Sequence, residues 1–238
     1  NLGINGVYFM EIAKMRAARM LWAQVVAQYT ADKEAAKMHV CAYTTTYNQT
    51  IFDSYVNLLR SQTGTMSAAL GGVESIVVRP FDLPYETPTE FAERIARNQQ
   101  LLLKDECHFD RMVDVAGGSY FIEELTAALA QQAWKLFLSV EEAGGFLKAA
   151  QAGTIQTAIN ETNKTRHANA GKRKEFLLGT NQFPNFTEKS EGKQPAACCC
   201  ACGGGKEGTD TVAIQSTRLA SDFEALRLTT EQAPKTPV

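Results

Sequence analysis

The chain has 238 residues, a formal net charge of -2 and 45% hydrophobic residues. This composition is that of a globular protein, with room for one large domain or two small ones. The near-neutral charge gives no electrostatic reason to expect nucleic acid or an anionic membrane as a partner. No apolar run approaches the roughly 20 residues of a membrane-spanning helix. The cysteines do not form a disulfide framework, so we expect a reducing cytoplasm.

An amphipathic helix is predicted first, over about residues 7–28, because apolar side chains recur there at three- and four-residue spacing. Three strand–helix units then follow at nearly even spacing. Their strands are predicted at 40–43, 75–78 and 112–115, and their helices at about 53–70, 87–104 and 122–142. Such alternation predicts parallel strands joined by right-handed helical crossovers, in either a (β/α) barrel or a doubly wound sheet. A complete barrel needs eight units in about 250 residues, so three units are an incomplete barrel.

The remainder of the chain is predicted to contain two more helices, over about 155–173 and 217–229. Between them, residues 187–217 hold few apolar side chains and are predicted to form a linker. The chain begins at Asn1 and ends at Val238 without a capping pattern, so we expect a fragment of a longer protein.

Several blocks stand out in order along the chain: EIAKMRAARMLW at 11–22, DSYVNLLR at 53–60, RIARN at 94–98, DVAGGSY at 114–120, LGTNQFPN at 178–185 and FEALRL at 223–228. Together they resemble the methylmalonyl-CoA mutases, a family of acyl-CoA mutases that use adenosylcobalamin. The resemblance implies an α/β fold in which residues 1–186 are the last three strand–helix units of a (β/α)8 TIM barrel. It implies that a Gly/Cys-rich linker at 187–217 and a terminal helix follow. It further implies that residues 218–238 begin a cobalamin-binding-like domain.

Within this family, the chain is similar to the small, non-catalytic (beta) subunit. Catalytic subunits carry a histidine and a glutamine on one barrel strand, facing the thioester. Aligned through the 53–60 block, this chain has Cys41 and Tyr43 at those positions. A thiol cannot replace an imidazole as a donor to a carbonyl oxygen, because S–H is a weak donor. At the end of the next strand, Arg79 and Asp82 also resemble the small subunit, and Arg79 could fill the barrel mouth.

The resemblance implies a function in which a heterodimer interconverts methylmalonyl-CoA and succinyl-CoA by a radical rearrangement. This chain would contribute no catalytic, cofactor-binding or metal-binding residue, and it would stabilise a catalytic large subunit that binds the acyl-CoA. Adenosylcobalamin would be held by the assembly. One alternative is a fragment of a catalytic acyl-CoA mutase of related specificity, which Cys41 disfavours. A second alternative is a metal- or partner-binding protein in which the cysteine-rich linker is the functional part.

The histidines of the chain are His39, His108 and His167, and none lies in the Asp-x-His-x-x-Gly motif with which some family members ligate cobalt. Asn98 falls on the apolar stripe of its predicted helix, where we expect its amide to bond to a neighbouring loop. Asp114, like Asp82, lies at a predicted strand end, where a carboxylate can serve either catalysis or loop-fixing.

Two further motifs admit both a binding and a structural interpretation. Gly117-Gly118-Ser119 opens a predicted helix, so its N–H groups could cradle a CoA phosphate or only form a tight turn. The cluster Cys198-Cys199-Cys200-Ala201-Cys202 has enough thiols for Zn²⁺, but adjacent cysteines depart from the usual C-x₂₋₄-C spacing. A spacer without metal is the alternative for this cluster.

Overall fold

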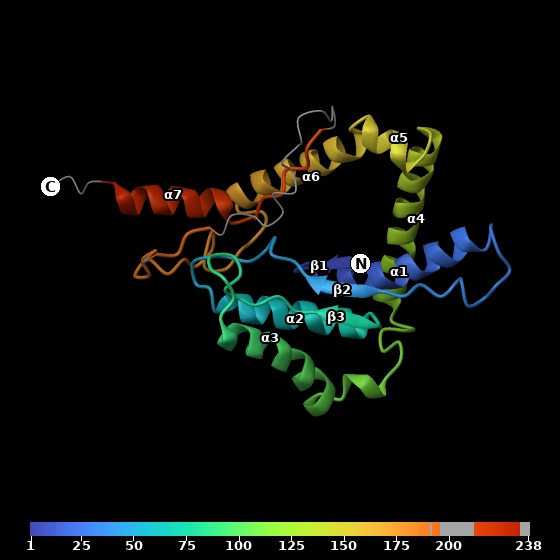
Figure 1. The fold of residues 1–238 in the computed structure, drawn as a ribbon, viewed down its shortest axis with the longest axis horizontal. Helices are drawn as coiled ribbons and strands as arrows, with labels where there is room; N and C mark the ends of the chain where they lie inside the picture. The colour runs from blue at the N-terminus through green and yellow to red at the C-terminus, as the bar shows by residue number, and fades with distance from the viewer. Residues whose placement is uncertain (191, 196–211, 234–238) are drawn as a thin grey trace. The chain divides into compact units, whose positions relative to one another are not determined.

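The structure is a computed structural model, and it describes residues 1–190, 192–195 and 212–233. These residues form two compact units (Figure 1). Unit 1 contains residues 1–45, 60–79 and 93–145, and unit 2 contains 46–59, 80–92 and the described residues from 146 onward. No helix among the described residues has the length and apolar character needed to cross a membrane.

Unit 1 is built on a parallel three-stranded sheet in the order β1-β2-β3. Its strands are short: β1 (Leu2–Ile4), β2 (Cys41–Thr44) and β3 (Ser75–Val77). Leu2 pairs with Ala42, which pairs with Ile76, so these side chains project from the same face of the sheet. Figure 1 shows β1 and β2 running in the same direction. The parallel sheet with helical connections is therefore as predicted.

Two helices cover that face of the sheet. They are α1 (Tyr8–Val26) and α2 (Val56–Leu70). Met15 of α1 and Ala68 of α2 are fully buried in a cluster with Ile4, Val40 and Ala42. Because the opposite face of β2 carries the half-buried Cys41 and Tyr43, the sheet packs its core on one side only among the described residues.

The helix α4 (Tyr120–Glu142) packs along α1. Phe9 and Phe121 make an edge-to-face contact with ring centroids 5.8 Å apart. Arg16 of α1 forms ion pairs with Glu123, at 2.6 Å, and with Asp114. Aromatic packing and charge pairing therefore fix the first turn of α4 against α1.

The predicted strand at 112–115 is wrong, and the third strand of the sheet is Leu2–Ile4, which pairs with β2 on the side opposite to β3. Val113 is 96% exposed, and Asp114 has a positive φ of 50° that a strand cannot contain. The Gly117 N–H donates to the Asp114 carbonyl at 2.9 Å, which closes a turn. An apolar run becomes a strand only beside a neighbour with a free edge, and this run turns back to Arg16 instead.

In chain order, β3 is followed by α3 (Glu90–Leu101). A π turn over Leu102–Glu106 and a 3-10 turn over Phe109–Arg111 then lead to α4. The helix predicted at about 87–104 begins at Glu90. Thr89 caps it, since its hydroxyl accepts the Ala92 N–H at 3.2 Å.

Unit 2 contains three further helices, α5 (Phe146–Gln151), α6 (Thr154–Gly171) and α7 (Ser221–Gln232). Its buried cluster joins Ala170 and Leu177 to Leu219 and Ala220, with Tyr47 and Phe223 packed against them. The C-terminal helix therefore shares a core with α6 and with the loop that follows β2.

The predicted linker at 187–217 is described only in part. Lys193 pairs with Glu188 at 2.9 Å, and the side chains of Asn160 and Asn163 bond to residues 213–217. The cluster at Cys198–Cys202 lies outside the described residues.

Candidate functional site

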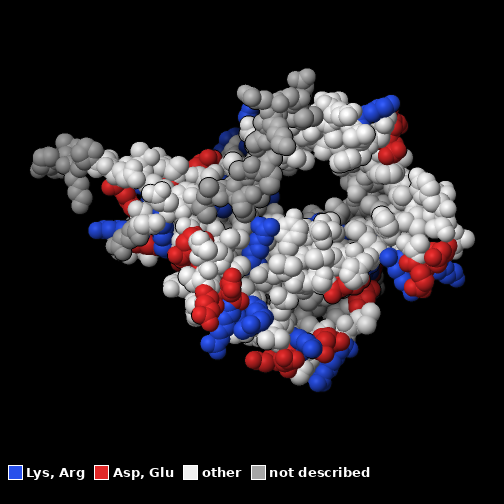
Figure 2. Space-filling model, in the orientation of Figure 1, with Lys and Arg blue, Asp and Glu red and all other residues white. Residues whose placement is uncertain are grey.

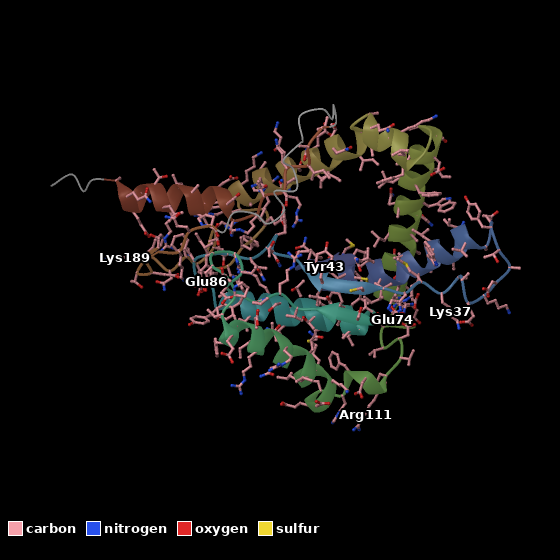
Figure 3. The ribbon with its side chains drawn as sticks, viewed as in Figure 1. Lys37, Tyr43, Glu74, Glu86, Arg111 and Lys189 are labelled. Carbon is pink, nitrogen blue, oxygen red and sulfur yellow. The ribbon has the colours of Figure 1, made fainter. Side chains whose placement is uncertain are left out.

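The carboxyl ends of β2 and β3 are where a parallel barrel would place working groups. There the guanidinium of Arg79 lies over the Tyr43 ring, 5.1 Å from its centroid. The Arg79 N–H also donates to the Thr44 hydroxyl at 2.9 Å. Figure 3 shows Tyr43 at the arrowhead end of β2. The guanidinium is attracted to the electron-rich face of the ring, so the two side chains hold each other in place.

The side chains of β2 alternate between the two faces of the sheet. Ala42 and Thr44 are buried toward the helices, whereas Cys41 and Tyr43 project to the opposite face as half-buried groups. Gly3 is the neighbour of Tyr43 in β1, and a Cβ there would stand 2.8 Å from the Thr45 methyl group. The Thr45 side chain therefore lies close to Gly3, the neighbour of Tyr43. Cys41, two residues before Tyr43 on β2, is a free thiol.

Asp82 belongs to unit 2 and has a different set of contacts. Its side chain is fully buried, and Oδ2 accepts both the N–H and the hydroxyl of Thr89 at 2.8 Å. Its Oδ1 has no hydrogen-bond partner among the described residues. Asp82 thus fixes the residue that caps α3, whereas in unit 1 Arg79 contacts Tyr43, and Cys41 shares the face of β2 that carries Tyr43.

At the amino end of the same sheet, Glu74 and Arg19 tie strands to helices. The Glu74 carboxylate accepts the Val40 N–H at 2.7 Å and lies 3.4 Å from the Arg19 guanidinium, which also donates to the Gly71 carbonyl. Burial acts to raise the pKa of Glu74, but these donors hold that pKa below its ordinary value. Figure 3 shows Glu74 away from Tyr43, at the start of β3. These contacts are structural, as expected at this end of a barrel strand.

The prediction for Asn98 is wrong, because Asn98 is exposed and the next residue is the buried one. Gln99 bonds to the Ser61 hydroxyl, with its amide nitrogen at 3.0 Å. A shift of one residue rotates a side chain by about 100° around a helix, so a stripe read from the sequence easily misplaces it.

In the Gly117-Gly118-Ser119 turn, a backbone N–H that could bind a phosphate already has an acceptor within the chain. The Gly118 N–H donates to the Glu123 carboxylate at 3.0 Å, and Glu123 also pairs with Arg16. An internal carboxylate therefore occupies the helix N-terminus where a phosphate could bind.

Sequence reasoning missed the buried charge pair between Arg218 and Glu224. Glu224 is 1% exposed, and its carboxylate binds Arg218 at 2.5 Å and accepts the Ile51 N–H at 2.8 Å. Only its place in the FEALRL block marked it, because a glutamate in a short polar helix ordinarily faces solvent.

The histidines do not form a metal centre. His39 and His108 are exposed, and His167 has both ring nitrogens in contact, with Asp222 at 2.9 Å and Thr217 at 3.1 Å. Across the described residues, no three His, Cys, Asp or Glu side chains cluster as metal ligands would. On the face that Figure 2 shows, basic and acidic side chains are intermixed, which is unlike a nucleic-acid-binding surface.

Comparison with known proteins agrees with the blocks described above. A sequence model of the family described as methylmalonyl-CoA mutase matches residues 1–197. The chain is 54% identical to the methylmalonyl-CoA mutase small subunit of Porphyromonas gingivalis, over 100% of this chain and 38% of that protein. It is 38% identical to the small subunit of Streptomyces virginiae, over 79% of this chain and 30% of that protein.

A third relative is the methylmalonyl-CoA mutase of Rhizobium meliloti, which is 34% identical over 95% of this chain and 31% of that protein. The chain spans less than two fifths of the length of each of these relatives. The predicted resemblance is confirmed by a match over most of the sequence: the chain belongs to the methylmalonyl-CoA mutase family.

Proposed function

We propose that this chain is part of the small, non-catalytic subunit of an adenosylcobalamin-dependent methylmalonyl-CoA mutase. Two of the relatives above are named small subunits, and the one that is 54% identical matches the whole chain. In this proposal, the small subunit stabilises a catalytic large subunit in a cytoplasmic heterodimer. The assembly interconverts methylmalonyl-CoA and succinyl-CoA, and the large subunit binds the acyl-CoA.

The contact between Arg79 and Tyr43 carries the non-catalytic part of the proposal. A thioester carbonyl needs a donor, and in the catalytic subunits that this chain resembles, a histidine and a glutamine supply it. Here the corresponding side chains are a weak thiol donor at Cys41 and a tyrosine whose ring lies under a guanidinium at 5.1 Å. The carboxylate of Asp82 is committed to Thr89. These contacts, and the weak thiol at Cys41, support a strand end that lacks the histidine and glutamine pair of the catalytic subunits.

The fold supports placing the three strands in a (β/α)8 barrel. The strands are parallel, and helices pack on one face only. In a closed barrel, the opposite face, which carries Cys41 and Tyr43, would line the interior. The division into a barrel part at 1–186, a linker at 187–217 and a cobalamin-binding-like part from 218 remains part of the proposal.

The described residues do not fit adenosylcobalamin. A lower cobalt ligand needs a free imidazole nitrogen, and both nitrogens of His167 are engaged by Asp222 and Thr217. His39 and His108 are exposed, and among the described residues neither belongs to a cluster of three or more His, Cys, Asp or Glu side chains. We therefore assign the cofactor to the assembly and not to the described residues of this chain.

A reconstitution experiment tests the proposal. The full-length small subunit, the large subunit and their mixture are each assayed for conversion of methylmalonyl-CoA to succinyl-CoA with adenosylcobalamin. We expect no turnover by the small subunit alone, and a higher melting temperature for the large subunit in the mixture than alone. Turnover by the isolated small subunit would instead favour a catalytic mutase of related specificity.

Variants at the strand ends sharpen this test. In the heterodimer, Arg79→Ala and Tyr43→Phe should leave kcat and KM within about twofold of wild type, because neither side chain is proposed to contact substrate. Tyr43→Phe keeps the ring under the guanidinium and is the matched control for Arg79→Ala, which removes their contact. A tenfold or larger loss of kcat in Arg79→Ala, with Tyr43→Phe unaffected and the heterodimer intact, contradicts the non-catalytic assignment.

A further inference from the structure

The segment from Val212 to Gln232 contains a buried ion pair, and both of its members bond to the rest of unit 2. Arg218 binds the Glu224 carboxylate through two nitrogens, at 2.9 and 2.5 Å. The same pair reaches the loop that follows β2, because Arg218 donates to the Gln49 carbonyl at 3.1 Å and Glu224 accepts the Ile51 N–H at 2.8 Å. Glu224 is 1% exposed, so its charge depends on these donors for stabilisation.

Apolar packing reinforces the ion pair. Leu219 and Ala220 are buried against Ala170 and Leu177, and Phe223 packs on the same cluster. The Leu219 N–H also donates to the Tyr47 carbonyl at 2.8 Å. The surface that contacts this segment therefore offers both apolar side chains and backbone hydrogen-bond acceptors.

Each end of the segment has further contacts. Toward its start, Asn160 bonds to Ala213 and Gln215, at 3.1 and 2.9 Å. Toward its end, the Arg227 guanidinium lies 3.9 Å from the centroid of the Phe52 ring and donates to the Asn185 carbonyl at 2.7 Å. Contacts thus extend along the segment, and they combine charge, backbone hydrogen bonds and apolar burial.

We propose that residues 212–232 are a clasp: an interaction surface that binds residues 47–52, 160–170 and 177–188 of the same chain tightly enough to hold after the chain between 195 and 212 is cut. The specificity of the clasp lies in the Arg218–Glu224 pair, which satisfies polar backbone groups that no apolar side chain could. The partner of this surface is the chain's own polypeptide, so the C-terminal part of the full-length protein is anchored through these contacts as well as through the covalent chain. The inference stands independently of the mutase activity.

The test uses the full-length small subunit in complex with its partner. A site-specific protease recognition sequence is inserted between Gly203 and Gly204, and the protein is cut and passed over a size-exclusion column under native conditions. We expect the two fragments to co-elute. Separation of the wild-type fragments overturns the proposal.

Glu224→Gln supplies the specific contrast, because it leaves Arg218 buried without its charge partner. Both members lie on the same fragment, so the variant acts through the bonds that Glu224 and Arg218 make to the Ile51 N–H and the Gln49 carbonyl. Weaker bonds there should weaken association of the cut fragments by roughly tenfold or more. The matched control is Glu142→Gln, which makes the same change at an exposed position of α4. Equal retention of the fragments in both variants would show that the ion pair does not hold the clasp.

Hydrogen exchange is a second measurement, and it tests the clasp even if the Glu224→Gln variant folds poorly. Hydrogen exchange of residues 47–52 is followed in the uncut protein, in the cut protein and in Glu224→Gln. Protection of these amides should survive cutting and fall in the variant, whereas the Glu142→Gln protein should match wild type. Loss of protection on cutting alone contradicts the clasp.

Discussion

Replacing Asn57 should open the loop that follows β2. The side chain is fully buried at the start of α2, and its amide acts as a backbone surrogate. Its Oδ1 accepts the Thr50 N–H at 3.0 Å, and its Nδ2 donates to the carbonyls of Thr50 and Phe81, at 2.8 and 3.1 Å. One amide therefore satisfies backbone groups of two loops that are distant in sequence.

Asn57→Ala removes all of these partners at once. Each buried backbone group left unpaired costs about 1–3 kcal/mol, so three groups sum to roughly 3–6 kcal/mol after allowing for relaxation. At about 2–4 °C per kcal/mol for a domain of this size, the melting temperature should fall by roughly 6–24 °C. The amides of Thr50 and Ile51 should also exchange with solvent faster.

Calorimetry and hydrogen exchange of the full-length subunit measure both effects. Asn98→Ala is the matched control, because Asn98 is an exposed asparagine on α3 and its loss should change stability by less than about 0.5 kcal/mol. The reasoning is refuted if Asn57→Ala is as mild as the control, since water or a shifted loop would then be satisfying the backbone groups.

Two further substitutions test the backbone and the ion pairs. Gly179→Ala should destabilise the protein more than Gly118→Ala. Both glycines have a positive φ, but only at 179 would a Cβ stand 2.8 Å from the Asp53 side chain. Equal melting temperatures of the two variants would argue against this steric cost. Glu74→Gln should make the free energy of unfolding less dependent on pH in the acid range. The pKa of Glu74 is lowered on folding, so its stabilisation is present above the ordinary value of 4.5 and is lost as pH falls toward the folded value. Urea midpoints between pH 3 and 6 measure this, with an unchanged pH slope as the contrary result.

Periodicity predicted the long helices and the strands β2 and β3 because their signals are local. The helix expected at 7–28 is α1 (Tyr8–Val26), and the strand expected at 40–43 is β2 (Cys41–Thr44). Periodicity failed where pairing decides the outcome. Leu2–Ile4 is too short to show a pattern, yet it pairs with β2, whereas the more apolar run at 112–115 has no strand beside it.

The candidate site was predictable in position but not in contacts. The alignment to family blocks placed Cys41 and Tyr43 on one strand and Arg79 at the end of the next, and the contact between Tyr43 and Arg79 is known only from the structure. The buried charge of Glu224 was not predictable, because its partner Arg218 and the Ile51 N–H become neighbours only after folding.

The two ends of the sheet differ in how much their side chains contribute to the core. At the amino end, Glu74 and Arg19 join strands to helices, and Met15 fills the core between them, so the fold is stabilised away from the strand ends. At the carboxyl end, Arg79 contacts Tyr43 and adds little to that core. Substitution at the strand ends should therefore cost little stability, because function resides in side chains added to the scaffold.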